Sequence, residues 1–317
     1  MTGKERMIKA LRREPITEGL VPHFELVFYL TMEALGKVHP ANRTFYQWSQ
    51  MSALEKEAQL QDAASCFVDI AEKYQHSAIF VHPSVHEFDA VRRLLEIIRE
   101  RSGDEYFIMM HGDSTFSIPD GEHMVDFSVR MYEAPESIIE ESKRHTERLL
   151  EFAGKLRHTG LLDGFALCAD YCFNANPFFT CEMFEALIVP PLREIIAGYR
   201  EMGYYSIKHT DGNIMPILEQ MVSCKPDALH SLDPQGGVDL AEVKRLVGGR
   251  VALIGNVNCG LLQTGTDEQV REDVMRSLRD GMPGGGYIFS TSNCVYTGLA
   301  LERYELMHSI WMEHGKY

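Results

Sequence analysis

The sequence predicts an α/β fold, a (β/α)8 or TIM barrel, formed by one domain over residues 1–317. Three observations predict it: short apolar runs alternate with segments of helical periodicity, there are eight such runs, and several are apolar throughout. Runs that are apolar throughout are typical of parallel strands that helices cover. The eight predicted strands are residues 20–27, 77–83, 105–113, 164–171, 204–211, 227–234, 250–257 and 286–293.

Helices are expected before the first strand and between the later ones. Residues 2–5 have the Thr-x-x-Glu spacing of a capping box, which predicts a helix ahead of the first strand. Segment 87–103 repeats apolar residues at helical spacing and ends at a glycine, and segment 266–281 opens with a Thr-x-x-Gln capping box. Longer helical stretches cover 135–156 and 181–203, and the paired prolines in the second should break or kink it.

The segment between the first two strands, residues 28–76, is too long for a simple crossover. It predicts extra helices after the first strand. Two interpretations stay open: a lid over the barrel mouth, with Tyr29 as a substrate-binding residue, or an ordinary packed insertion.

Composition narrows the class of protein. A chain of 317 residues with 45% hydrophobic content can bury a large core. A net charge of −15 without a Lys/Arg stripe argues against nucleic acid and anionic membranes as partners. No run of about 18 apolar residues occurs, and the charged segment 1–15 lacks the apolar region of a secretion signal. Seven cysteines without repeated spacing favour reduced thiols, so we expect a cytoplasmic protein.

Polar side chains stand where the apolar runs in the second half of the chain end. They are His209, Asp211, Asp233, Asn256 and Cys294. In a parallel barrel these strand ends form the face that carries the active site. The first functional hypothesis is therefore an enzyme, with Asp233 and Asn256 expected to shape the substrate-binding cleft.

His209 and Asp211 are two residues apart in a predicted strand. Their side chains should point to the same side, where they could converge on one ion or one substrate atom. A second interpretation stays open. Asp211, Gly212 and Asn213 could form only a turn and helix cap, with His209 hydrogen-bonded inside the barrel.

Three more residues could complete a metal site around this pair. Cys294 could supply a thiolate, a soft ligand that suits zinc, although buried cysteines usually only pack. His23 and Glu25, two apart in the first predicted strand, add an imidazole and a carboxylate. We predict zinc as the metal, with His209, Asp211, Cys294 and Glu25 as its ligands, although no short motif such as HExxH is present.

Further polar residues at strand ends are assigned to the reaction. Asp170 lies at the end of the fourth predicted strand, and we predict that Asp170 and His23 position the substrate or move a proton, with His209 as the third catalytic residue. His111 and Glu25 are predicted to contact the substrate.

Ordered motifs in the second half of the chain carry a family resemblance. They are HTDGN (209–213), an Asp-Pro pair (233–234), IGNV (254–257), LLQTGTDEQV (261–270), GGGYIFSTSN (284–293) and a final aromatic helix ending in HGKY (314–317). With these motifs the chain resembles the uroporphyrinogen decarboxylase (URO-D) superfamily, which includes corrinoid-dependent methyltransferases. The opening segment 4–22 also resembles the start of that family. The resemblance implies a TIM barrel with its active site in a cleft at the C-terminal ends of the strands.

The resemblance also separates two branches. True uroporphyrinogen decarboxylases carry an arginine-rich segment after the first strand, whose cations hold the carboxylates of the substrate. Here that place reads HFELVFYL, and the next arginine is Arg43, so decarboxylation of that porphyrinogen is disfavoured. The methyltransferase branch binds zinc through a His-x-Cys pair and a later cysteine. His209 matches the histidine, Asp211 replaces the first cysteine, and Cys294 matches the last.

Carboxylate in place of thiolate makes the site harder, which suits polarising an ether or hydroxyl oxygen. We predict a zinc-dependent methyltransferase that moves a methyl group between a small substrate and the cobalt of a corrinoid (cobalamin) on a partner protein. The resemblance also implies a homodimer. Two alternatives stay open: a metal-free decarboxylase of a smaller substrate, with Asp170 and His209 as acid and base, and a barrel that serves only as a binding subunit.

Overall fold

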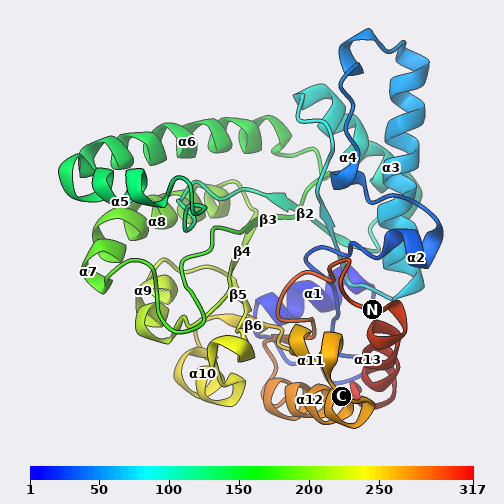
Figure 1. Ribbon diagram of the computed structural model, residues 1–317. Helices are drawn as coiled ribbons and strands as arrows, with labels where there is room; N and C mark the ends of the chain where they lie inside the picture. Colours follow the sequence, from blue (N-terminus) through cyan, green and yellow to red (C-terminus); the bar gives the residue numbers. More distant parts are fainter.

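The computed structural model describes residues 1–317 and contains seven strands in one curled, wholly parallel sheet (Figure 1). Each strand pairs with the next one in the chain, which confirms the predicted α/β fold with helical crossovers. Every strand lies inside one of the predicted runs. The strands are β1 (Ala78–Val81), β2 (Phe107–His111), β3 (Gly164–Leu167), β4 (Tyr205–Thr210), β5 (Ala228–Ser231), β6 (Ala252–Ile254) and β7 (Tyr287–Ile288).

The first predicted strand, residues 20–27, is not a regular strand. A single parallel bridge joins His23 to Phe289, just after β7, and the carbonyl of His23 accepts a hydrogen bond of 2.6 Å from the N–H of Ser77, just before β1. The segment therefore lies between the two edge strands of the sheet but lacks the continuous ladder of a strand. Pro22 has no N–H to contribute to such a ladder.

Helix α1 (Gly3–Leu11) lies at the N-terminal end of the strands. It contacts β1, β2 and β7, and the N–H of Lys4 donates to the carbonyl of Glu105, just before β2. Its apolar residues join those on the inner face of the sheet in one buried cluster, which includes Met7, Ala10, Leu11, Phe24, Phe80, Phe107, Met109, Ile207, Ile254 and Ile288. Because α1 occupies this end, the opposite end is left for functional side chains.

The remaining helices surround the sheet and bury its outer face (Figure 1). The predicted N-terminal helix, the helices after the first predicted strand and the two capping boxes are all present. No helix of the protein has the length and apolar character needed to span a membrane. The helices are α2 (Thr31–Leu35), α3 (Ala53–Lys73), α4 (Phe88–Ser102), α5 (Met124–Glu133), α6 (Pro135–Leu156), α7 (Cys181–Met183), α8 (Val189–Glu201), α9 (Leu218–Ser223), α10 (Leu240–Val247), α11 (Cys259–Thr264), α12 (Asp267–Gly281) and α13 (Leu301–His314).

The expected break in segment 181–203 takes the form of a widened turn. Residues Phe184–Ile188 form a π-helical turn between α7 and α8, and Pro190 and Pro191 follow in the first turn of α8. A proline inside a helix cannot donate its backbone hydrogen bond, and a π turn is one way to accommodate that loss.

Candidate functional site

Three side chains that could hold a metal ion converge at the C-terminal end of β3 and β4. They are Asp170, His209 and Asp211, and one ligand atom from each lies within 4.8 Å of the other two. His209 Nε2 is 3.7 Å from Asp170 Oδ1 and 3.8 Å from Asp211 Oδ1. The side chain of Asp170 is 44% exposed and that of His209 only 6%, so the group is reached from solvent on the Asp170 side.

Neither carboxylate in this group has a lysine or arginine partner; their only ion-pair contact is with His209. Burial, together with the neighbouring charges of Asp170 and Asp233, raises the pKa of Asp211 to about 7. Two close carboxylates without a counter-ion are stabilised by a cation. The donor set of two carboxylates and one imidazole therefore fits a divalent metal ion.

Neighbouring strand ends hold Asp211 in place. Its Oδ1 accepts a hydrogen bond of 2.7 Å from Ser231 Oγ, at the end of β5, and its Oδ2 accepts one from Asn293 Nδ2, after β7. The backbone N–H of Asp211 donates to Asp170 Oδ1 at 3.1 Å. These bonds bring the two carboxylates together by way of the loops rather than by an ion pair.

His209 is held from behind by a second histidine. Its Nδ1 lies 2.7 Å from Nδ1 of His230, the residue directly opposite it on β5. Burial lowers the pKa of His209 to about 4 and lowers the pKa of His230 well below its usual value. Both imidazoles are therefore neutral near pH 7, and a neutral imidazole is the form that binds metals.

Cys294 and Glu25, the other two predicted metal ligands, are not members of this group. Burial, together with nearby Asp211, raises the pKa of the Cys294 thiol to about 12, so the thiol is protonated in the metal-free protein. Oε2 of Glu25 accepts hydrogen bonds from Ser290 Oγ at 3.1 Å and Thr291 Oγ1 at 2.5 Å. Glu25 thus lies behind the strand ends, bonded to the segment after β7.

The structure does not bring His23 to the metal-binding group. Its Nδ1 lies 3.1 Å from the carbonyl oxygen of Phe289 and its Nε2 lies 3.1 Å from Tyr304 Oη, and the side chain is fully buried. Both ring nitrogens are therefore engaged in the core between the 20–27 segment and α13. A proton-transfer role at the strand ends does not follow from this position.

Asp233 and Asn256 contact the loops around the strand ends. Asp233 accepts hydrogen bonds from the N–H of Gln235 at 2.9 Å and of Gly212 at 3.3 Å. Asn256 is fully buried and donates to the carbonyl of Leu232 at 2.7 Å. That both residues shape the cleft stays a prediction.

His111 and Tyr29 were also predicted to contact the substrate. His111 is exposed at the end of β2. The Tyr29 ring contacts His39 edge-on, with ring centroids 5.0 Å apart. Neither residue belongs to the metal-binding group, and substrate contact stays a prediction for both.

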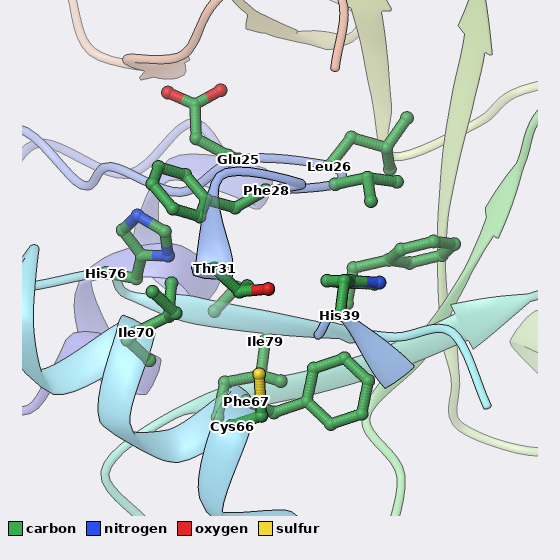
Figure 2. Close-up of a pocket in the computed structure, with 14 residues that line it drawn as sticks. Glu25, Leu26, Phe28, Thr31, His39, Cys66, Phe67, Ile70, His76 and Ile79 are labelled. Carbon is green, nitrogen blue, oxygen red and sulfur yellow. The ribbon is translucent and has the colours of Figure 1, made fainter. Parts of the chain in front are cut away.

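A cavity of about 30 Å³ lies between residues 25–31, α3 and β1 (Figure 2). Its lining is mainly apolar, and its volume corresponds to about one or two water molecules. Figure 2 shows the carboxyl group of Glu25 pointing away from Cys66, Phe67 and His39. None of the three metal-binding residues lines this cavity, so it is separate from the candidate site.

Sequence reasoning missed His230 and Lys208, which lie behind the site. His230 Nδ1 lies 2.7 Å from His209 Nδ1. Lys208 forms a buried pair with Asp113 at 2.9 Å, and this pair bonds to the backbone of residues 167–169, which leads to Asp170. The signal for Lys208 was available, because a lysine inside an apolar strand must find a buried partner. The position of His230 at a strand end was visible as well, but its partner was not.

Comparisons with known proteins identify the family and the fold. A family model described as uroporphyrinogen decarboxylase (URO-D) matches residues 130–314, more than half of the chain and the part that contains the metal-binding group. No curated protein matches the sequence.

Two solved structures illustrate the fold. A methyltransferase from Methanosarcina mazei has a TM-score of 0.74 at 15% identity, with 99% of each chain covered. A GH5_18 protein from Streptomyces cattleya in complex with GlcNAc has a TM-score of 0.54 at 11% identity, covering 92% of this chain and 79% of the other. Identities this low show a shared fold.

Proposed function

The chain belongs to the uroporphyrinogen decarboxylase family, and from that premise we propose that it is a methyltransferase that binds zinc through Asp170, His209 and Asp211. The observation that carries the proposal is the pair of close carboxylates on either side of a neutral imidazole, without a protein cation. The fold similarity to a methyltransferase over the whole chain supports it.

In this proposal the metal acts as a Lewis acid that polarises an oxygen of the substrate. His209 contributes Nε2, and Asp170 and Asp211 contribute carboxylate oxygens. Carboxylate and imidazole are harder donors than thiolate, so the site suits an oxygen-bearing substrate better than a thiol. Asp170, the most exposed of the three side chains, faces the solvent from which the substrate would enter.

The surroundings of the site argue against a substrate with many carboxylates. The buried cation closest in sequence, Lys208, is bound to Asp113 and to the carbonyls of Leu167 and Ala169. No lysine or arginine forms an ion pair with Asp170 or Asp211. A polycarboxylate would meet two carboxylates without a compensating charge.

We further propose that the methyl group is exchanged with a corrinoid carried by a separate protein. We also propose that the 20–27 segment completes the barrel as its eighth strand-like element, and that the protein forms a homodimer. The open strand ends beside Asp170 provide the face where a methyl carrier could reach the substrate. Pull-down with a corrinoid-binding protein and analytical ultracentrifugation test the two associations.

A second candidate function is metal-free decarboxylation of a smaller substrate. It is favoured by the pKa of Asp211, raised by burial to about 7, because such a carboxyl group can donate a proton near neutral pH. Activity that survives a strong chelator would support this alternative over the methyltransferase.

Elemental analysis of protein expressed with ample zinc tests the main proposal. We expect near-stoichiometric zinc in the wild type and none in His209→Ala. Asp239→Asn is the matched control, because Asp239 caps α10 away from the site and asparagine caps helices equally well. Zinc-free wild type, or equal zinc in His209→Ala, would overturn the proposal.

A further inference from the structure

A chain of hydrogen-bonding side chains leads from His209 to Glu25 through the buried end of the sheet. His209 Nδ1 lies 2.7 Å from His230 Nδ1, and His230 Nε2 lies 3.4 Å from Ser290 Oγ. Ser290 Oγ in turn donates to Glu25 Oε2 at 3.1 Å. All four residues are at least 95% buried, so water does not compete for these contacts.

The contacts of Glu25 with Thr291, at the end remote from His209, determine which groups donate and which accept along this series of hydrogen bonds. Thr291 Oγ1 lies 2.5 Å from Glu25 Oε2 and 2.6 Å from the carbonyl oxygen of Asn293. A carbonyl can only accept, so the threonine hydrogen goes either to Asn293 or to Glu25. If the threonine hydrogen goes to Asn293, the short contact between Thr291 and Glu25 needs another hydrogen. A protonated Glu25 carboxyl group, which donates to Thr291 Oγ1, supplies it.

Ser290 donates to Glu25 in either case. Burial raises the pKa of Glu25 to about 8, which places a proton on it near pH 7, and the short Thr291 contact accounts for that proton. If Glu25 is ionised instead, it has no hydrogen to give and can only accept. In both states the single hydroxyl hydrogen of Ser290 is used on Glu25.

Once Ser290 has given its hydrogen to Glu25, its oxygen must accept from His230 Nε2. The His230 side chain is buried and hydrogen-bonds only with His209 and Ser290, with no carboxylate to balance a second proton, so a proton on Nε2 leaves a lone pair on its Nδ1. Only one proton fits between two nitrogens 2.7 Å apart, and it therefore belongs to His209 Nδ1.

We propose that Glu25 is a positioning residue which, through Ser290 and His230, fixes His209 as the Nδ1-protonated tautomer with the Nε2 lone pair directed at Asp170 and Asp211. This tautomer is the one that a metal ion at Nε2 requires. The proposal rests on the proposed function for its purpose, but the tautomer is a property of the metal-free protein. Glu25 thus acts on the site from three contacts away.

Nitrogen-15 NMR of the histidine rings in chelator-treated wild-type protein tests the tautomer directly. We expect His209 to be protonated at Nδ1 and His230 at Nε2. The reverse assignment would overturn the inference, and it would do so whether or not the protein binds zinc. If the tautomers are as expected but zinc does not bind, the inference stands and the proposed function fails.

Two pairs of variants test the role of Glu25. Glu25→Met removes the acceptor and should give a mixture of His209 tautomers, whereas Glu25→Gln keeps an oxygen acceptor and should preserve the wild-type tautomer. Ser290→Ala cuts the chain, and Ser292→Ala is its matched control, because Ser292 is equally buried but outside the chain.

Zinc titration provides the second measurement. Loss of an outer partner of a metal ligand costs roughly 10- to 100-fold in metal affinity, and we expect that loss in Glu25→Met and Ser290→Ala but not in Glu25→Gln or Ser292→Ala. If Glu25→Met does not fold, Ser290→Ala carries the test. An unchanged His209 tautomer in Ser290→Ala would overturn the inference.

Discussion

Lys208 and His209 are neighbours in β4, but their side chains lie in two different electrostatic environments. Lys208 points to the outer face, where it meets Asp113 at 2.9 Å and two backbone carbonyls, and neither charged side chain is more than 2% exposed. His209 points to the inner face, where two carboxylates have no cation. The charges of Lys208 and Asp113 compensate each other, and we call them the complete pair. The carboxylates of Asp170 and Asp211 beside His209 have no cation, and we call these three residues the incomplete cluster.

The difference separates structural from functional charge. A buried pair whose donors and acceptors are all used holds the backbone in place and has no capacity for a ligand. A cluster of like charges at a solvent-accessible position costs free energy until a cation arrives. The pair of Lys208 and Asp113 orders the end of β3 that leads to Asp170. The complete pair therefore supports the incomplete cluster.

The largest expected effect comes from breaking the complete pair. Lys208→Met should lower the free energy of unfolding by about 3–5 kcal/mol, because Asp113 is left as an uncompensated buried charge. Although burial alone would raise it, Lys208 holds the pKa of Asp113 well below its usual range. Urea unfolding followed by circular dichroism measures the loss.

The double variant Lys208→Met/Asp113→Asn serves as the control for this prediction. It removes both charges and should recover part of the lost stability. If the single and double variants are equally unstable, the pair contributes through packing and not through charge compensation.

The incomplete cluster should respond to a cation where the complete pair does not. At a zinc concentration of 100 times the dissociation constant, the free energy of unfolding should rise by about 2.7 kcal/mol, because zinc binds only the folded protein. Asp211→Asn should abolish this gain, and Asp239→Asn should retain it. Thermal unfolding with and without zinc measures it, and an equal gain in Asp211→Asn would place the ion elsewhere.

The stability of the metal-free protein should depend on pH through Asp211. The change per pH unit should be smaller than the gain expected from zinc. Folding raises the pKa of Asp211 from 3.8 to about 7, chiefly through burial, so the folded state binds more protons than the unfolded state between these values. Stability should therefore fall as pH rises from about 4 to about 7, by at most about 1.4 kcal/mol per pH unit for one proton.

The difference between wild type and Asp211→Asn isolates this contribution from other titrating groups. Urea unfolding at several pH values, in the presence of a chelator, provides the measurement. A wild-type curve parallel to that of the variant would mean that Asp211 is not perturbed by its neighbours.

Much of the fold and part of the site could be predicted from the sequence. Continuous apolar runs locate the seven strands, because a covered parallel strand has no polar face to interrupt it. The His209 and Asp211 pair follows from the two-residue repeat of a strand. The prediction of a regular strand failed for residues 20–27. This segment contains polar residues and Pro22, and it forms a single bridge to Phe289 instead of a ladder.

The remaining features depend on contacts between distant parts of the chain. Asp113 and Lys208 are 95 residues apart, and Glu25 meets Ser290 across 265 residues. No local pattern encodes such pairs. Glu25 was predicted as a ligand from its place in the first predicted strand, and the family resemblance supported Cys294. The fold directs Glu25 to Ser290 and Thr291 and leaves Cys294 outside the group of three.

The smallest effect is expected from Cys294→Ser, and it sharpens the boundary of the cluster. The family resemblance predicts Cys294 as a zinc ligand, whereas the structure places a protonated thiol outside the group of three. Binding zinc through this sulfur would require loss of its proton next to Asp211. We therefore expect Cys294→Ser to reduce zinc affinity much less than His209→Ala does.

Cobalt substitution distinguishes the two arrangements without reference to activity. A thiolate bound to Co²⁺ gives an intense sulfur-to-metal charge-transfer band in the near ultraviolet, which carboxylate and imidazole ligands do not give. We expect the cobalt-loaded wild type to lack this band and to resemble Cys294→Ser. A strong band in the wild type that disappears in Cys294→Ser would show that the loop after β7 moves on metal binding. The incomplete cluster would then comprise four ligands, one of them drawn from the strand end that also carries Ser290 and Thr291.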